Sequence, residues 1–95
     1  MVRQAHIVVT GKVQGVFYRH HAHKKATELG LTGRICNLED LSVEIIAEGE
    51  EEPISLFIEW CHEGPPAAEV DDVAVDFRDG VREFSDFRII NWEEL

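Results

Sequence analysis

The apolar positions in the first third of the chain change from a strand-like to a helix-like spacing. Residues 5–10 are rich in β-branched side chains and half-alternating, which predicts a strand. From residue 18 the apolar side chains recur at spacings of four, four and three, which predicts a helix. These positions are Tyr18, Ala22, Ala26 and Leu29. Gly30 follows, where a helix commonly ends.

The middle of the chain predicts two more strands and the turn that joins them. We expect the second strand over residues 31–37 and the turn over residues 38–41. Apolar side chains then alternate with others at Val43, Ile45 and Ala47, which predicts a third strand with one clearly apolar face.

The remaining residues predict a second helix followed by two strands. Acidic residues and Pro53 suit the start of a helix, because its N-terminus is partly positive and Pro fits its first turn. An apolar stripe at helical spacing follows, and Gly64 with two prolines ends it. The stripe comprises Ile54, Phe57, Ile58 and Cys61. Apolar residues within 70–77 and 84–90 predict two strands, with a turn at 78–81.

The predicted order of elements is therefore β-α-β-β-α-β with a short extra strand at the C-terminal end. This is the ferredoxin-like arrangement of the α+β class, in which two helices cover one face of an antiparallel sheet. A length of 95 residues suits one domain, so we expect residues 1–95 to form a single domain. The fold alone does not indicate a function, because it hosts many activities.

Composition and net charge exclude several classes of protein. The chain is 44% hydrophobic and 29% charged, which is typical of a soluble globular protein. It has no apolar run long enough to span a membrane and no signal peptide, so we expect a cytoplasmic monomer without a membrane partner. The net charge is −10, which argues against nucleic acid as a partner because phosphate backbones demand clustered Lys and Arg.

The charge is unevenly divided along the chain. Residues 1–37 carry a net charge of +5, and residues 38–95 carry a net charge of −15. The first third could therefore attract a small anion while the rest keeps the molecule in solution. From the charges alone, an accidental division is an equally good interpretation.

Two cysteines, Cys36 and Cys61, form no CxxC pair, and we expect them to be reduced, partly buried thiols. Cys61 belongs to the inward stripe of the second predicted helix. If Ile35 faces the helices, alternation along the strand turns Cys36 away from them. The pattern therefore argues against a disulfide.

The stretch from Gly11 to Arg19, GKVQGVFYR, carries the clearest candidate chemistry. Gly11 and Gly15 allow positive φ and a close approach by an oxygen, and consecutive N–H groups leading into a helix bind anions. Arg19 would add a planar fork that grips two phosphate oxygens. On the residues alone, an ordinary tight turn with a solvated Arg19 is a competing interpretation.

This stretch resembles the signature of the acylphosphatase family, G-x-V-Q-G-V-x-[FY]-R. Residues 29–37 resemble the start of the family's second signature, and residues 64–66 and 87–89 also fit. The resemblance spans essentially the whole chain. It implies the βαββαβ fold and an enzyme that hydrolyses the carboxyl–phosphate anhydride of small acyl phosphates, giving a carboxylate and inorganic phosphate. It implies no metal and no cofactor.

The resemblance also implies the roles of individual residues. Arg19 and a run of backbone amides would bind the phosphoryl oxygens, and Asn37 would hold the attacking water. The amides are those of Gln14, Gly15, Val16, Phe17 and Tyr18. Phosphoryl transfer needs mainly charge stabilisation and in-line placement of the nucleophile. Asn37 can only orient the water, because an amide neither gains nor loses a proton at working pH.

The chain departs from the family's pattern at two positions near Asn37. Cys36 stands where the family usually has Arg or Lys, and Leu41 stands where it usually has Gly. A turn with positive φ would cost Leu41 roughly 1 kcal/mol or more. We therefore expect an altered turn at residues 38–41, with consequences for the placement of Asn37 and for activity.

Three other interpretations carry less support from the residues. His20, His21 and His23 lie together, but a zinc site needs three or four ligands and no Cys or acidic partner is near in sequence. We expect a solvated helix start here rather than a metal site, and these histidines could tune the pH dependence of phosphate binding. The first alternative to an enzyme is a domain that binds acyl or carbamoyl phosphate for a larger enzyme, which the length of 95 residues disfavours. The second is a non-catalytic binding module, which the presence of both Arg19 and Asn37 disfavours.

Overall fold

The structure, a computed structural model, describes residues 1–91 and contains the expected elements in the expected order. Along the chain they are β1 (Arg3–Lys12), α1 (Tyr18–Glu28), β2 (Thr32–Asn37), β3 (Val43–Gly49), α2 (Glu51–Glu63), β4 (Glu69–Asp79) and β5 (Phe87–Ile89). The predicted βαββαβ order with a short additional strand is confirmed. No helix within residues 1–91 is long and apolar enough to cross a membrane.

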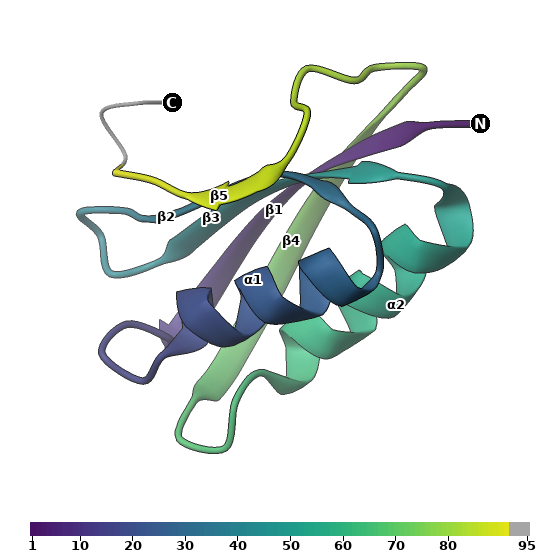
Figure 1. The fold of residues 1–95 in the computed structure, drawn as a ribbon. Helices are drawn as coiled ribbons and strands as arrows, with labels where there is room; N and C mark the ends of the chain where they lie inside the picture. The colour runs from purple at the N-terminus through teal and green to yellow at the C-terminus, as the bar shows by residue number, and fades with distance from the viewer. Residues whose placement is uncertain (92–95) are drawn as a thin grey trace.

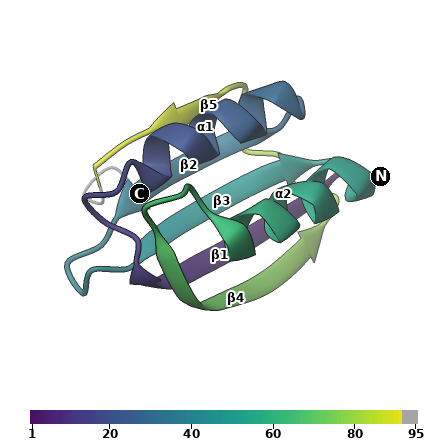
Figure 2. The ribbon, with the colours of Figure 1, turned by 90° about the horizontal axis from the view of Figure 1, so that it is seen from below.

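The strands form one sheet in the order β4-β1-β3-β2-β5, and both helices lie on the same face of it (Figures 1 and 2). β1 pairs antiparallel with β3 and β4, and β2 pairs antiparallel with β3. This confirms the ferredoxin-like α+β arrangement. β5 instead pairs parallel with β2, so the sheet is mixed. The expectation of an antiparallel sheet is wrong for this last strand, because residues 80–86 carry the chain from one edge of the sheet to the other.

Alternate residues of β1 and β3 face the helices and are fully buried, as a period of two predicts. They are Ala5, Ile7, Val9, Val43, Ile45 and Ala47. Tyr18 of α1 and Phe57 of α2 are the largest fully buried side chains of the same core. Full burial of an aromatic side chain of this size stabilises a fold by about 3 kcal/mol. The core therefore fixes β1 and α1, between which the candidate loop lies.

α1 ends at Glu28, and Gly30 supplies the left-handed residue that closes it, with φ 72°. The Leu31 N–H donates to the carbonyl oxygen of Ala26 (2.9 Å), and the Gly30 N–H donates to that of Thr27 (3.1 Å). This pair of hydrogen bonds is the Schellman motif. The predicted helix end is confirmed.

A buried carboxylate, Glu48 near the end of β3, anchors the chain between β4 and β5. Its oxygens accept four hydrogen bonds of 2.6–3.1 Å, two from backbone N–H groups and two from side chains. The donors are the N–H groups of Glu83 and Phe84, Gln4 Nε2 and Thr32 Oγ1. Burial raises the pKa of Glu48, but the hydrogen bonds outweigh burial and hold the pKa below its usual range.

Several strand boundaries and the burial of the thiols differ from the sequence expectation: β1 is longer at both ends, and β5 begins at Phe87 rather than at residue 84. β4 continues through Asp79 because its last residues pair with β1, so the turn starts at Gly80 rather than at residue 78. Both cysteines are free, as expected, but both are fully rather than partly buried. Burial raises the pKa of Cys61 to about 12.

Candidate active site

Three positive φ values shape the connection from β1 to α1: Gly11 at 125°, Gly15 at 73° and Phe17 at 63°. At Gly11 a Cβ would lie 2.2 Å from the carbonyl oxygen of Glu69 on β4, so only glycine fits. At Gly15 a Cβ would meet no atom within 4 Å, which leaves open space beside the backbone. The positive φ expected at the two glycines is confirmed, and Phe17 adds a third position that the sequence did not predict.

The N-terminus of α1 has no capping group. Its first hydrogen bond runs from the His21 N–H to the Phe17 carbonyl oxygen (3.1 Å), so the N–H groups of Tyr18, Arg19 and His20 have no acceptor within the helix. No side chain of residues 1–91 caps the helix, and its first turn contains no acidic residue. The unpaired N–H groups and the helix dipole favour a negative charge at this point.

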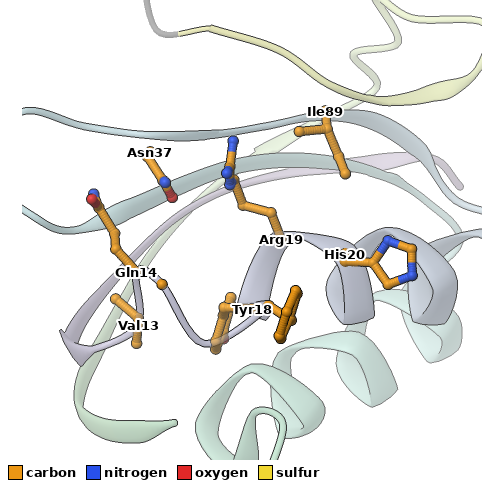
Figure 3. A pocket seen from close by; sticks show the side chains of 9 residues that line it. Val13, Gln14, Tyr18, Arg19, His20, Asn37 and Ile89 are labelled. Carbon is orange, nitrogen blue, oxygen red and sulfur yellow. The ribbon is translucent and has the colours of Figure 1, made fainter. Parts of the chain in front are cut away.

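These N–H groups adjoin a pocket of about 280 Å³ between the loop, the start of α1, β2 and β5. Its lining residues are Val13, Gln14, Gly15, Phe17, Tyr18, Arg19, His20, Asn37 and Ile89. Figure 3 shows Arg19 extending from α1 towards the sheet, with Asn37 on one side of it and Ile89 on the other. Of the site residues expected from the sequence, all but Val16 line this pocket, and the Val16 side chain is buried in the core.

Asn37 is the last residue of β2, and its side-chain oxygen is buried without a hydrogen-bond partner among the described residues. Leaving such an atom unpaired costs about 1–3 kcal/mol, so native proteins rarely do so without a reason. In Figure 3 the Asn37 amide is directed into the region between Gln14 and Arg19. An unpaired acceptor in this position is suited to a water molecule in the pocket.

The positive charge of Arg19 is not neutralised by an ion pair with any residue in the part of the chain that the structure describes. Within residues 1–91 no acidic side chain lines the pocket either. The charge of Arg19 also acts on Cys36 of β2. Burial and the neighbouring Glu44 raise the pKa of Cys36, and Arg19 partly opposes this rise. The site therefore offers an anion one uncompensated cation beside unpaired N–H groups.

Gln14 links the loop to the turn between β2 and β3. Its side-chain NH₂ group donates to the carbonyl oxygens of Leu38 and Ser42, both at 2.9 Å. Both hydrogens of the amide are thereby used, so only its backbone N–H is left for an anion. Sequence reasoning missed this link, because only the fold brings the turn beside the loop.

The turn between β2 and β3 keeps a left-handed residue at Leu41, with φ 75°. The Leu41 N–H donates to the Leu38 carbonyl oxygen (3.2 Å), and the Leu38 N–H donates to that of Ser42 (2.9 Å), which is a common three-residue hairpin loop. The expected altered turn is therefore wrong. Asp40 compensates, because it accepts hydrogen bonds from the hydroxyl and N–H of Ser42, which lower the pKa of Asp40.

Tyr18 anchors the start of α1 to α2. Its hydroxyl donates to the carbonyl oxygen of Cys61 (2.7 Å), and its ring lies 5.2 Å from that of Trp60. Burial raises the pKa of Tyr18 far above its usual range, so the hydroxyl stays protonated. The fully buried Tyr18 side chain thus fixes the position of the N–H groups at the start of α1. Trp60 packs against the core.

The histidines of α1 have separate environments. His20 is exposed and lines the pocket, whereas His23 Nε2 lies 2.9 Å from the Phe87 carbonyl oxygen and joins α1 to β5. Within residues 1–91 no group of three or more His, Cys, Asp or Glu side chains is arranged to hold a metal ion.

Comparisons with known proteins agree on one family. A sequence model of the acylphosphatase family matches residues 5–89. An acylphosphatase of Marinobacter nauticus is 52% identical over 87 residues, covering 92% of this chain and 95% of the relative. An acylphosphatase structure from Coxiella burnetii superposes with a TM-score of 0.88 at 45% identity and covers 94% of this chain and 93% of that one. For acylphosphatase from Bacillus subtilis the TM-score is 0.90 at 34% identity, with 95% and 99% covered. The chain belongs to the acylphosphatase family of enzymes.

Proposed function

We propose that this enzyme hydrolyses the carboxyl–phosphate anhydride of small acyl phosphates by direct attack of a water that Asn37 positions. The observation that carries the proposal is the juxtaposition in one pocket of three features: the unpaired Arg19, the open N-terminus of α1 and the unpaired oxygen of Asn37. The first two suit a phosphoryl group, and the third suits a water beside it.

The phosphoryl group binds at the β1–α1 loop. The Arg19 guanidinium donates to two of its oxygens, and the backbone N–H groups of residues 14–18 stabilise the remaining charge. In the transition state the charge spreads over the three equatorial oxygens, so donors that are already fixed stabilise it without reorganising. The burial of Tyr18 and the Gln14 link support this reading, because both hold the loop in place.

The water donates a hydrogen bond to Asn37 Oδ1 and attacks phosphorus in line with the bridging oxygen. A bond forms between the water oxygen and phosphorus, and the bond between phosphorus and the bridging oxygen breaks. Its electron pair leaves with the carboxylate, and both water protons remain on the phosphate until it equilibrates with solvent. No strong base is needed, because a carboxylate is a good leaving group, and Asn37 orients the water without taking its proton.

A module that only binds phosphate is the competing interpretation. Such a module needs Arg19 and the loop but has no use for a buried, unpaired acceptor beside them. The cost of leaving Asn37 Oδ1 without a partner therefore favours a catalytic water over simple binding.

The test is hydrolysis of benzoyl phosphate in the presence of a metal chelator by the wild type, Arg19→Ala and Asn37→Ala. We expect activity in the wild type and near-complete loss in both variants. In water labelled with oxygen-18, the label is expected in phosphate and not in benzoate. Lys24→Ala is the matched control, because it removes a positive charge from α1 outside the pocket and leaves the rate unchanged. Full activity in Arg19→Ala, or label in benzoate, would overturn the proposal.

A further inference from the structure

We propose that Phe17 and Ile89 form an acyl-binding subsite that selects acyl phosphates with extended apolar acyl groups over acetyl phosphate. The proposal rests on the proposed function, because it concerns the leaving group of the same reaction. It is carried by the arrangement of the pocket, by the exposure of two apolar side chains and by the distribution of charge.

The arrangement of the pocket fixes where the acyl group lies. In-line displacement places the leaving group opposite the attacking water, on the far side of the phosphorus. In the proposed mechanism Asn37 positions the water, and Arg19 binds the phosphoryl group. Figure 3 shows Ile89 on the side of Arg19 away from Asn37. The acyl group therefore projects towards β5, where Ile89 is one of the residues that line the pocket.

Two of the apolar side chains that line the pocket are exposed. Phe17 is 75% exposed and Ile89 is 40% exposed, and both line the pocket. Single exposed hydrophobic residues are ordinary, but two that line one polar pocket offer apolar surface that an apolar ligand would cover.

The backbone at Phe17 strengthens this assignment. Its φ of 63° is a conformation that glycine adopts without strain, and a side chain there costs about 1–2 kcal/mol. The ring does not repay this cost by burial, because the residue is largely exposed. A large apolar side chain held at such a position indicates a role in contacting a ligand.

Charge decides the class of acyl group. Among residues 1–91, Arg19 and His20 are the only lining residues with a basic side chain, and no acidic residue lines the pocket. The Arg19 guanidinium binds the phosphoryl group, so it is not available to a second carboxylate or phosphate on the acyl group. An acyl group with an ammonium group finds no carboxylate from residues 1–91 there. The subsite therefore fits an uncharged, apolar acyl chain or ring.

The experiment compares hexanoyl phosphate with acetyl phosphate, because the two leaving carboxylates have nearly the same basicity. For the wild type we expect a kcat/KM about tenfold higher for hexanoyl phosphate, with the difference mainly in KM. In Phe17→Ala and in Ile89→Ala the ratio of the two kcat/KM values falls to about threefold or less. Leu56→Ala is the control: it removes a 44% exposed apolar side chain of α2 that does not line this pocket, and it keeps the wild-type ratio.

A binding measurement without turnover separates the subsite from the chemistry. Hexylphosphonate is expected to inhibit the wild type about tenfold more strongly than methylphosphonate, and this preference falls in the Phe17→Ala and Ile89→Ala variants. Equal kcat/KM for the two substrates in the wild type, or a wild-type ratio in both variants, overturns the subsite. If acetyl phosphate is then still hydrolysed and Arg19→Ala is inactive, the proposed function stands. Hydrolysis of neither substrate by the wild type overturns both.

Discussion

Leu41 occupies a backbone conformation that favours glycine, at a position where its side chain gains little from packing. Its φ is 75° and the residue is 67% exposed. A Cβ in this region crowds the following carbonyl oxygen, at a cost of about 1–2 kcal/mol. The hydrogen bonds from Ser42 to Asp40 hold the turn in spite of this cost, and Asn37 stays in a regular strand.

Leu41→Gly is therefore expected to raise the free energy of unfolding by about 1 kcal/mol, because it removes the crowded Cβ. Urea unfolding at neutral pH measures the change. Leu41→Ala is the matched control, since it removes most of the exposed side chain but keeps the Cβ, and no comparable gain is expected from it. An equal gain in both variants would show that side-chain exposure, and not the backbone, is the cause.

At the residue scale, local features were predictable and non-local ones were not. The positive φ at Gly15 and the helix start at Tyr18 follow from nearby residues, and the sequence predicts both. The hydrogen bonds of Gln14 and the unpaired oxygen of Asn37 arise between segments that are distant in sequence. No spacing encodes such contacts, so only the family resemblance pointed to Asn37.

At the element scale, β5 depends on its neighbours more than on its own sequence. It has only three residues, and two backbone hydrogen bonds help to fix it beside β2. The Gly33 N–H donates to the carbonyl oxygen of Asp86 (2.8 Å), and the Ile90 N–H donates to that of Ile35 (2.9 Å). The sequence predicts an apolar strand here but not its direction, because the direction is decided by the path of residues 80–86 across the sheet. Glu48 anchors that path.

Glu48→Gln is expected to destabilise the fold by about 2–3 kcal/mol at neutral pH, because an NH₂ group would face buried donors. Urea unfolding measures the loss. Glu44→Gln is the control: Glu44 also lies on β3, four residues earlier, and its partner is the exposed side chain of His6 (2.8 Å), so a loss below about 0.5 kcal/mol is expected. A similar loss in both variants would contradict the anchoring role of Glu48.

The stability contributed by Glu48 also depends on pH. Because the pKa of Glu48 is held below its ordinary value of 4.5, the carboxylate stabilises the fold above pH 4.5 and loses this effect as pH falls below that value. Asp40 and Asp86 have lowered pKa values too, so the wild type loses stability in acid for several reasons. The informative quantity is the difference between wild type and Glu48→Gln, which is expected to shrink on acidification from neutral pH. A difference that stays constant through this range would contradict the assignment.

At the scale of the whole molecule, the pocket places an uncompensated cation, Arg19, on an acidic protein. All of its lining residues except Ile89 come from residues 1–37, which carry a net charge of +5, whereas the chain as a whole carries −10. A cation without a counter-charge attracts small anions, while net negative charge elsewhere opposes association. The order of elements was predictable because the spacing of apolar residues was clear in each element. That Ile89 and Arg19 line the same pocket could not be predicted, because it depends on the pairing of β5 with β2 in the completed sheet.

In the proposed mechanism Arg19 and the β1–α1 loop bind the phosphoryl group, and Asn37 acts only on the water. The most direct measurement is the Kd of inorganic phosphate for Asn37→Ala and Arg19→Ala by titration calorimetry, set beside kcat for acetyl phosphate. We expect Asn37→Ala to keep phosphate affinity within about threefold while kcat falls about 100-fold or more, and Arg19→Ala to lose phosphate affinity about tenfold or more. A loss of phosphate affinity in Asn37→Ala as large as its loss of kcat would contradict this account.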